Sequence, residues 1–366
     1  MAGSMSSQAQ APLRGPARRT ARALARTLQP APAPALVYVS DEQPGWQRVR
    51  RGRGFAYLDA AGRPLREREA LQRIRRLAIP PAYTDVWICP QANGHLQATG
   101  RDARGRKQYR YHPDWQAQRD ADKFERMLEF GRALPRLRAR IRRDLAAGGL
   151  AREQVIATLV HLLDTTFVRI GNDEYARLNG SYGLTTLRDR HARFLGGALR
   201  LKFKGKSAVV HEIEVDDPRI VRIVRRCQDL PGQELFQYLD ADGTPRSIGS
   251  ADVNDYLREA AGADFTAKDF RTWHASVQAL ERLARCTAGS PAEARRLVRE
   301  ALAHVARQLG NTVAVCRKSY VHPRVLACFV EGTLADSLAC AAGHHGARVP
   351  AALRAPERRL MGLLQL

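Results

Sequence analysis

The spacing of the apolar residues changes near residue 116, and this change most constrains the fold. Up to that point the chain has short β-favouring runs separated by turn residues, such as 54–58 and 85–89. Beyond it, apolar residues recur three or four positions apart, as on one face of a helix, and 151–168 is a clear example. The pattern predicts an α+β fold, with a small, mainly antiparallel β domain at 36–116 and a larger, mostly helical domain with a small hairpin at 117–366.

The small domain should contain three strands and one helix, at 36–39, 54–58, 85–89 and 67–77. Residues 98–112 then combine a glycine loop with alternating basic and aromatic residues. Glycines allow close backbone approach, cations pair with phosphates, and Gln or Tyr can reach base edges. This run therefore suggests a DNA contact, and a solvated loop followed by an ordinary edge strand is the alternative.

The large domain should consist mainly of helices. They are expected at 117–147, 151–168, 218–228, 250–261, from Thr266 onward, from Ser290 to Gly310, and within 321–366. Gly131 and Pro135 should break the first of them. Residues 197–215 alternate apolar and polar positions, which predicts a hairpin with its turn at Lys204–Ser207, and short strands should flank Asp242 and Gly243.

The chain carries a strong excess of positive charge. Lys and Arg number 60 against 37 Asp and Glu, which gives a net charge of +23. Such a balance predicts a polyanionic partner, with nucleic acid as the first choice and an acidic membrane surface as the second. Residues 1–35 contain no acidic residue and almost no large apolar one, so we expect a disordered basic arm. This arm either adds DNA affinity or is a passive tail.

Cysteine and histidine positions argue against a metal site. The six cysteines lack the CxxC spacing of zinc sites, and His344 and His345 have no cysteine or carboxylate close in the sequence. No apolar run reaches the roughly 18 residues that a transmembrane helix needs. We therefore expect no metal, no cofactor and no membrane insertion, and a soluble cytoplasmic protein with reduced thiols.

The run Cys316–Pro323 places Tyr320 beside Arg317 and Lys318. A phenol with a pKa of about 10 is a poor nucleophile at neutral pH. It becomes useful against an electrophile that cations have already neutralised, such as a phosphodiester held by arginines. These eight residues alone favour an ordinary basic surface run, so the case for chemistry depends on the rest of the chain.

Six motifs in order resemble a known family. They are the run from Gly100 to Tyr111 and the segments 168–172, 203–206, 268–272, 309–312 and 317–320. From about residue 36 onward the chain resembles the type IB DNA topoisomerases, of the compact poxvirus-like kind also found in bacteria. Each motif is weak alone, but their shared order and intervals are highly specific.

The resemblance implies a C-shaped clamp of the two domains around duplex DNA, acting as a monomer without ATP or an essential metal. It also implies that Tyr320 is the nucleophile, forming a 3′-phosphotyrosyl link and freeing a 5′-hydroxyl. Arg169 and Arg271 would bind the non-bridging oxygens, and Lys206 would be the general acid that protonates the leaving 5′-oxygen. The supercoiled duplex would be relaxed by cleavage and religation of one strand.

Asn311 departs from the family pattern, since many members carry histidine at this position. An amide NH₂ can still donate a hydrogen bond to a phosphate oxygen, but it can neither carry a positive charge nor shuttle a proton. We therefore expect Asn311 to bind the transition state without transferring a proton.

Further positions match DNA contacts of the family or add cations to its motifs. They are Gln108, Tyr109, Tyr111, Arg101, Arg106, Lys107, Lys204, Lys268 and Lys318. With double-stranded DNA as its partner, the protein is expected at the nucleoid.

Two other functions remain open from the sequence. A tyrosine recombinase uses the same nucleophile and cations, but usually has a histidine three residues before the second arginine, where this chain has Lys268. A non-catalytic DNA-binding protein that keeps only the fold is the second alternative. It would bind DNA in a salt-sensitive manner and form no covalent adduct.

Overall fold

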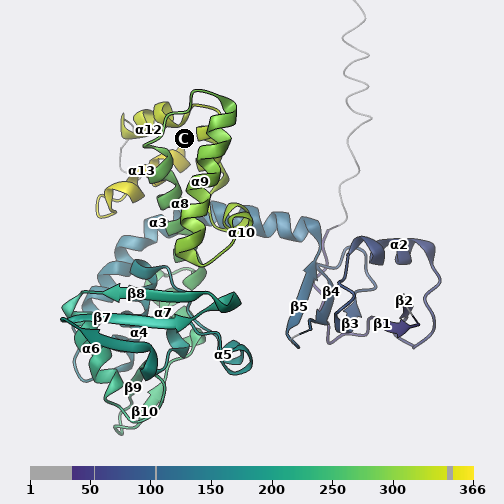
Figure 1. The fold of residues 1–366 in the computed structure, drawn as a ribbon, viewed down its shortest axis with the longest axis horizontal. Helices are drawn as coiled ribbons and strands as arrows, with labels where there is room; N and C mark the ends of the chain where they lie inside the picture. Colours follow the sequence, from purple (N-terminus) through teal and green to yellow (C-terminus); the bar gives the residue numbers. More distant parts are fainter. Residues whose placement is uncertain (1–34, 53, 104, 344–348) are drawn as a thin grey trace, which may run out of the picture. The chain divides into compact units, whose positions relative to one another are not determined.

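The computed structural model describes residues 35–52, 54–103, 105–343 and 349–366. Its contacts divide the chain into two compact units, Met1–Arg119 and Asp120–Leu366 (Figure 1). The first unit is mostly antiparallel β structure and the second is mostly helical, which confirms the predicted α+β class. The predicted disordered arm falls, except for Ala35, outside the described residues.

The first unit is built on one five-stranded antiparallel sheet in the order β2-β1-β3-β4-β5. Its elements are β1 (Trp46–Arg51), β2 (Gly54–Leu58), α2 (Arg68–Arg76), β3 (Thr84–Ile88), β4 (Leu96–Arg101) and β5 (Lys107–Tyr111). Ile74 of α2 packs against Val86 and Ile88 of β3 and forms a small core. This core fixes the sheet that carries the basic and aromatic hairpin β4-β5.

Two of the three predicted strands and the predicted helix are present as β2, β3 and α2. The predicted strand at 36–39 is wrong, because there only Val37 forms an isolated bridge, to Gly94. The strand that pairs with β2 is β1, which the sequence reading missed. Three of its six residues are arginines, and their long side chains hide the half-buried alternation that marks a strand.

The second unit contains a three-stranded antiparallel sheet in the order β6-β7-β8 and a two-stranded ribbon. The strands are β6 (Ala192–Leu195), β7 (Ala198–Lys204), β8 (Val210–Val215), β9 (Gln237–Leu239) and β10 (Pro245–Ser247). The predicted hairpin is confirmed as β7-β8, with Phe203 opposite His211 and Lys204 opposite Val210. Its turn is longer than predicted and covers 205–209.

Helices make up the rest of the second unit. The longer ones are α3 (Pro113–Leu145, which begins in the first unit), α4 (Arg152–Thr166), α6 (Pro218–Gln228), α7 (Ser250–Ala261), α8 (Ala267–Leu283), α9 (Pro291–Leu309) and α13 (Ala355–Gln365). The shorter ones are α5 (Asp173–Asn179), α10 (Val313–Ser319), α11 (Pro323–Val330), α12 (Leu334–Gly343) and the 3₁₀ turns η1 (Leu184–Thr186), η2 (Asp189–His191) and η3 (Lys206–Ala208). In Figure 1 the β6-β7-β8 sheet lies toward one end of this unit and α12 and α13 toward the other, with α8 and α9 between.

The predicted break of the first long helix at Gly131 and Pro135 is wrong, since α3 runs through both residues. Gly131 is buried against α8 and α13. A Cβ built on it would lie 2.4 Å from Met361 Sδ and 2.6 Å from the Trp273 ring. The glycine therefore permits close helix packing rather than ending the helix.

A buried network of charged groups links four helices of the second unit. Arg138 of α3 pairs with Asp164 of α4 at 2.8 Å and with Glu357 of α13 at 2.7 Å. His274 of α8 lies 3.1 Å from the same Asp164 carboxylate. This network fixes the end of α4, from which the chain continues into Phe167 and Arg169.

Among the described residues, no single helix is long and apolar enough to cross a bilayer. Only the pair α11 and α12 passes such a test, by length and composition, and these helices are bent at 117° to each other.

Candidate active site

Arg271 is presented by the first turn of α8, whose start the sequence fixes. Thr266 and Asp269 form a capping box there, with Thr266 N donating to Asp269 Oδ2 at 2.7 Å. Arg271 lies one turn into the helix and is only 3% exposed. Its guanidinium donates to the carbonyl of Phe167 and, at 2.8 Å, to that of Leu309. One buried side chain thereby joins the ends of α4 and α9.

Arg169 lies in the loop that follows α4. The helix ends at Phe167, whose backbone is left-handed (φ 61°) and so turns the chain out of the helix. Arg169 then reaches across to donate to Asn311 Oδ1 and, at 3.3 Å, to the carbonyl of Gly310. It is half-buried, and its guanidinium therefore lies beside the end of α9 rather than in open solvent.

Asn311 follows α9 at a sharp turn. Gly310 caps the helix with a left-handed backbone (φ 59°), a conformation that favours glycine. The Asn311 amide N–H still bonds back to the carbonyl of Ala306 at 2.9 Å. The side chain is thereby held rigidly, with Oδ1 occupied by Arg169 and Nδ2 left over.

Tyr320 lies at the end of α10, and α9 and α10 pack side by side (Figure 1). Its amide donates to the carbonyl of Cys316 at 3.0 Å. Its carbonyl lies 3.2 Å from the hydroxyl of Ser276 on α8, and the same hydroxyl accepts the amide of His322 at 2.9 Å. These backbone anchors place the phenol ring 5.2 Å from the Arg271 guanidinium.

The charges around Tyr320 favour its ionised form. Burial raises the pKa of the phenol, but Arg271, then Arg169 and a contact with Asn311, outweigh burial and bring it below its ordinary value. Burial also disfavours the charged form of Arg271 and lowers its pKa to about 10, and the neighbouring charge of Arg169 acts in the same direction. Both arginines therefore remain charged at neutral pH, in positions where water solvates them poorly.

Two buried donors in this cluster have no hydrogen-bond partner among the described residues. They are Arg271 Nε and Asn311 Nδ2. No carboxylate of the described residues forms an ion pair with Arg169 or Arg271. A buried, unpaired donor costs about 1–3 kcal/mol and a buried charge costs more. Unpaired donors and charges that converge beside a phenol are the features of a site for an anion.

Lys206 lies at the tip of the β7-β8 hairpin, in the 3₁₀ turn η3. Its side chain is exposed and, within the described residues, forms no hydrogen bond or ion pair. The two residues after it, Ser207 and Ala208, have left-handed backbones (φ 62° and 64°), which are strained for residues with a Cβ. The backbone of the hairpin tip is therefore held in a strained conformation. The exposed ammonium group of Lys206 is available to a ligand.

The first unit gathers six of the predicted DNA contacts on its β4-β5 hairpin. Tyr109 and Tyr111 stack with ring centroids 6.1 Å apart and are 48% and 37% exposed. Arg106 and Gln108 both donate to Asp102, at 2.7 and 3.0 Å. Lys107 pairs with Asp41 at 2.6 Å, and Arg101 donates to the carbonyl of Gly105 at 2.9 Å. The hairpin is thus held in shape by its own charged groups and by Asp41 from outside it.

The remaining predicted cations, Lys204, Lys268 and Lys318, are all exposed. Lys268 is on the first turn of α8 and Lys318 is near the end of α10, the helices that carry Arg271 and Tyr320. Lys204 ends β7, two residues before Lys206. Each of the three therefore borders an element that carries a predicted catalytic residue.

Two residues of this region were missed by the sequence reading. Ser276 fixes the backbone of Tyr320, yet a serine in the middle of a helix gives no sequence signal for such a role. His211 on β8 lies against the turn at Gly310, and only the hairpin register brings it there. Both depend on tertiary contacts.

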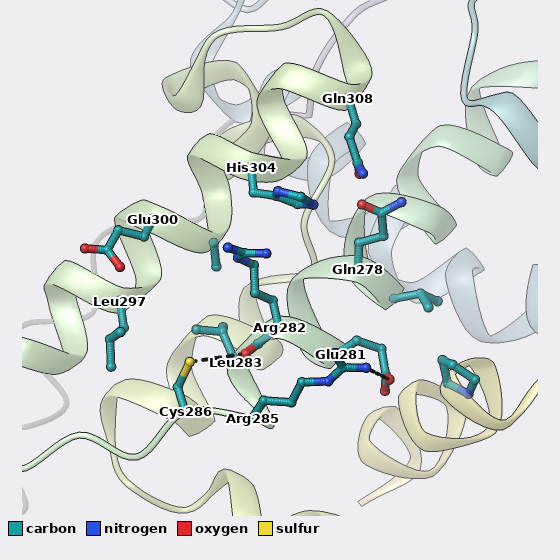
Figure 2. A pocket seen from close by; sticks show the side chains of 13 residues that line it. Gln278, Glu281, Arg282, Leu283, Arg285, Cys286, Leu297, Glu300, His304 and Gln308 are labelled. Carbon is teal, nitrogen blue, oxygen red and sulfur yellow. Dashed lines mark hydrogen bonds and ion pairs between the residues drawn. The ribbon is translucent and has the colours of Figure 1, made fainter. Parts of the chain in front are cut away.

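A hollow of about 560 Å³ lies between α8 and α9, beside Pro356 (Figure 2). Its lining includes Gln278, Arg282, His304 and Gln308. Arg169, Arg271, Asn311 and Tyr320 are not among its lining residues. The hollow is therefore separate from the cluster of donors around the phenol.

The structure thus brings Arg169, Arg271, Asn311 and Tyr320 together from four separate elements around one phenol. This constellation, on an α+β protein with a basic β hairpin, is typical of the class of enzymes that act on a phosphodiester with a tyrosine. The family model of the eukaryotic DNA topoisomerase I catalytic core matches residues 112–331. The model of the bacterial DNA topoisomerase IB N-terminal domain matches residues 54–102.

Individual relatives agree with these models. The chain is 33% identical over 285 residues to a DNA topoisomerase 1B of Acanthamoeba polyphaga mimivirus, covering 76% of this chain and 85% of that protein. It is 22% identical over 265 residues to the DNA topoisomerase I of Monkeypox virus and to a DNA topoisomerase 1B of Vaccinia virus, covering 70% of this chain and 80% of each of them. The protein belongs to the type IB DNA topoisomerases.

Proposed function

We propose that this topoisomerase relaxes supercoiled duplex DNA by cutting and resealing one strand through Tyr320. The phenol gives up its proton to solvent and its oxygen, as the phenolate, attacks a backbone phosphorus. A new O–P bond forms, and the bond from phosphorus to the 5′-oxygen breaks as that oxygen takes up a proton. The products are a 3′-phosphotyrosyl link and a free 5′-hydroxyl, and attack by that hydroxyl reverses the step. The observation that carries this proposal is a pair of donors, Arg271 Nε and Asn311 Nδ2, that no described residue accepts from and that lie beside a phenol of lowered pKa.

Arg169 and Arg271 act by neutralising the phosphate as its charge develops. Backbone carbonyls hold both guanidinium groups in place, so little reorganisation is needed in the transition state. Removing one comparable donor from a preorganised site slows catalysis by about 10²–10³. We expect losses of that size or larger for Arg169→Ala and Arg271→Ala.

Asn311 donates its free Nδ2–H to a phosphate oxygen. Its Oδ1 accepts from Arg169, which fixes the amide orientation that leaves Nδ2 available. The amide performs the binding part of the role that histidine has in many relatives, and it moves no proton.

Lys206 supplies the proton to the leaving 5′-oxygen. An alkoxide is a poor leaving group, and general acids typically contribute about 10²–10⁴ in rate. An exposed ammonium on a shaped hairpin tip suits this role because it can reach a bound strand from outside the buried cluster. The exchange conserves phosphodiester energy, so it requires no ATP. Arg169 and Arg271 supply the positive charge that a metal would otherwise provide, so no essential metal is required.

The two units together close around duplex DNA as a C-shaped clamp formed by one monomer. The exposed Tyr109 and Tyr111 on the first unit supply aromatic faces, and the basic residues of the same hairpin meet phosphates. With its net charge of +23, the protein is expected to remain at the nucleoid in the cytoplasm. A hydroxyl-radical footprint that covers the whole circumference of the duplex supports the clamp, and protection of one face only contradicts it.

Relaxation of a plasmid tests the proposal directly. Wild-type protein should relax a plasmid that carries no special site, with no nucleotide and with a chelator present, while Tyr320→Phe should not. A tyrosine recombinase would need paired sites. A non-catalytic binding protein would bind supercoiled and relaxed plasmid in a salt-sensitive manner, and it would leave the supercoiled plasmid supercoiled.

A further inference from the structure

His211 is a titratable residue at the edge of the active site that has no role in the mechanism above. It lies on β8 directly opposite Phe203 of β7. Its ring stacks on the buried Phe203 ring, with centroids 5.2 Å apart and an angle of 21°. The imidazole is thereby fixed at the base of the loop that carries Lys206.

One edge of this imidazole is enclosed by two glycines. A Cβ built on Gly205 would lie 2.7 Å from His211 Cδ2 and 2.8 Å from Nε2. A Cβ built on Gly310 would lie 2.8 Å from Cε1 and 3.1 Å from Nε2. Gly310 is also required by its left-handed backbone, but Gly205 has an ordinary φ of −91°. At Gly205, therefore, a side chain is excluded by the closely packed histidine ring and not by the backbone conformation.

The two glycines precede the residues that matter for chemistry. Gly205 precedes Lys206, and Gly310 precedes Asn311 and accepts a hydrogen bond from Arg169 through its carbonyl. His211 is therefore a direct physical contact between the hairpin that carries the general acid and the turn that carries Asn311.

We propose that His211 is a positioning residue for DNA cleavage. Its imidazole is a rigid spacer that sets the Lys206 loop against the Gly310–Asn311 turn, so that the ammonium group meets the leaving 5′-oxygen. The inference rests on the general-acid role proposed for Lys206. The surroundings favour the neutral ring: burial lowers the pKa of His211, and the charges of Arg169 and Arg271 lower it further.

The test compares two leaving groups. Cleavage sites of the wild-type protein are first mapped on a plasmid, and a nicked suicide duplex is made with either oxygen or sulfur at the bridging 5′ position of one site. A thiol, with a pKa of about 8.5, leaves as the thiolate without a proton donor, whereas an alcohol needs one. Single-turnover cleavage of both duplexes then separates loss of the general acid from loss of phosphate binding.

His211→Ala should slow cleavage of the oxygen duplex by about tenfold to a hundredfold, the usual cost of misplacing a catalytic group by an ångström. It should leave cleavage of the sulfur duplex within about threefold of wild type, since no proton donor has to be in place there. Lys206→Ala should show the same selective rescue. The double variant Lys206→Ala/His211→Ala should be no slower than Lys206→Ala, because the histidine acts through the lysine.

Glu212→Ala is the matched control, as Glu212 is the next residue of β8 and pairs with Lys202 on the exposed face. It should change neither rate. If His211→Ala does not fold, as judged by thermal melting, His211→Asn replaces it, since the shorter side chain also withdraws from the glycines.

The outcomes distinguish the two proposals. If Lys206→Ala is not rescued by sulfur, the general-acid assignment itself is wrong. If Lys206→Ala is rescued while the histidine variant is equally slow on both duplexes, or is as fast as wild type on oxygen, the role of His211 is wrong and the proposed function stands.

Discussion

Replacing Asn311 with aspartate changes one atom and should move stability and activity in opposite directions. The side chain keeps its shape, and its carboxylate still accepts from Arg169. The unpartnered Nδ2 donor disappears, and the hydrogen bond to the guanidinium becomes charge-assisted at both ends. Relief of a buried orphan donor and the stronger bond together favour the folded protein by about 1–3 kcal/mol.

For a unit of about 250 residues, this gain corresponds to a rise in Tm of about 2–4 °C per kcal/mol, measurable by calorimetry. Cleavage should fall by at least about 10²–10³, because a donor to the phosphate is lost. The new negative charge also neutralises Arg169 and repels the phosphate. Single-turnover cleavage of a nicked suicide duplex measures this loss.

Asn311→His is the control for the same position. It restores a donor and should keep cleavage within about tenfold of wild type, because imidazole can donate to the same oxygen. An Asn311→Asp protein that cleaves at the wild-type rate would refute the argument that Nδ2 binds the phosphate. A variant that is both inactive and less stable would refute the argument from the orphan donor.

Arg169→Ala should shift the rise of cleavage rate with pH to higher pH, since this cation helps to lower the pKa of Tyr320 and a phenolate is the nucleophile; rates measured from about pH 6 to pH 10 check this. Gly131→Ala should destabilise by about 1–3 kcal/mol in a chemical melt through overpacking, although alanine favours helices, whereas Gly148→Ala, which has open space, should not destabilise. Asp164→Asn should lower the free energy of unfolding by about 3–5 kcal/mol at neutral pH, because it breaks a buried ion pair. The folded-state pKa of Asp164 lies well below its ordinary value, so its stabilising contribution is present above the unfolded carboxyl pKa and is lost as pH falls through the folded pKa. The difference in Tm between the variant and the wild type should therefore close only in strong acid.

Much of the fold was predictable because local rules decide it. The strand at 54–58 and the helices α6 and α7 have the predicted bounds, and α9 starts after the Ser290 cap and stops at Gly310 as its sequence predicts. In these segments the turn and capping residues agree with the apolar spacing, so no tertiary information is needed.

The errors arose where packing overrides local preference. Gly131 and Pro135 read as helix breakers, but close contact with Met361 and Trp273 makes glycine suitable inside α3. The short helix α10, which positions Tyr320, has too few residues to show a period. Motif order still identified four residues that the structure brings together, because the resemblance carries tertiary information that periodicity lacks.

That four residues lie together does not by itself establish what each of them does. The sequence indicated Arg169, Arg271, Asn311 and Tyr320 by resemblance. The structure adds the buried donors, the backbone anchors and the lowered phenol pKa that make a phosphate the natural ligand. The contact of His211 with Gly205 and Gly310 lay beyond sequence reasoning, since no local pattern relates these positions.

The most direct measurement is the chemical identity of the trapped protein–DNA bond. A nicked suicide duplex releases the short strand downstream of the cut, so the covalent complex accumulates and can be digested and sequenced by mass spectrometry. We predict one adduct, on the Tyr320 oxygen, joined to a 3′-phosphate, with a free 5′-hydroxyl on the released strand and no adduct from Tyr320→Phe. An adduct on another residue, a 5′-phosphate linkage, or undiminished adduct formation by Tyr320→Phe would contradict it.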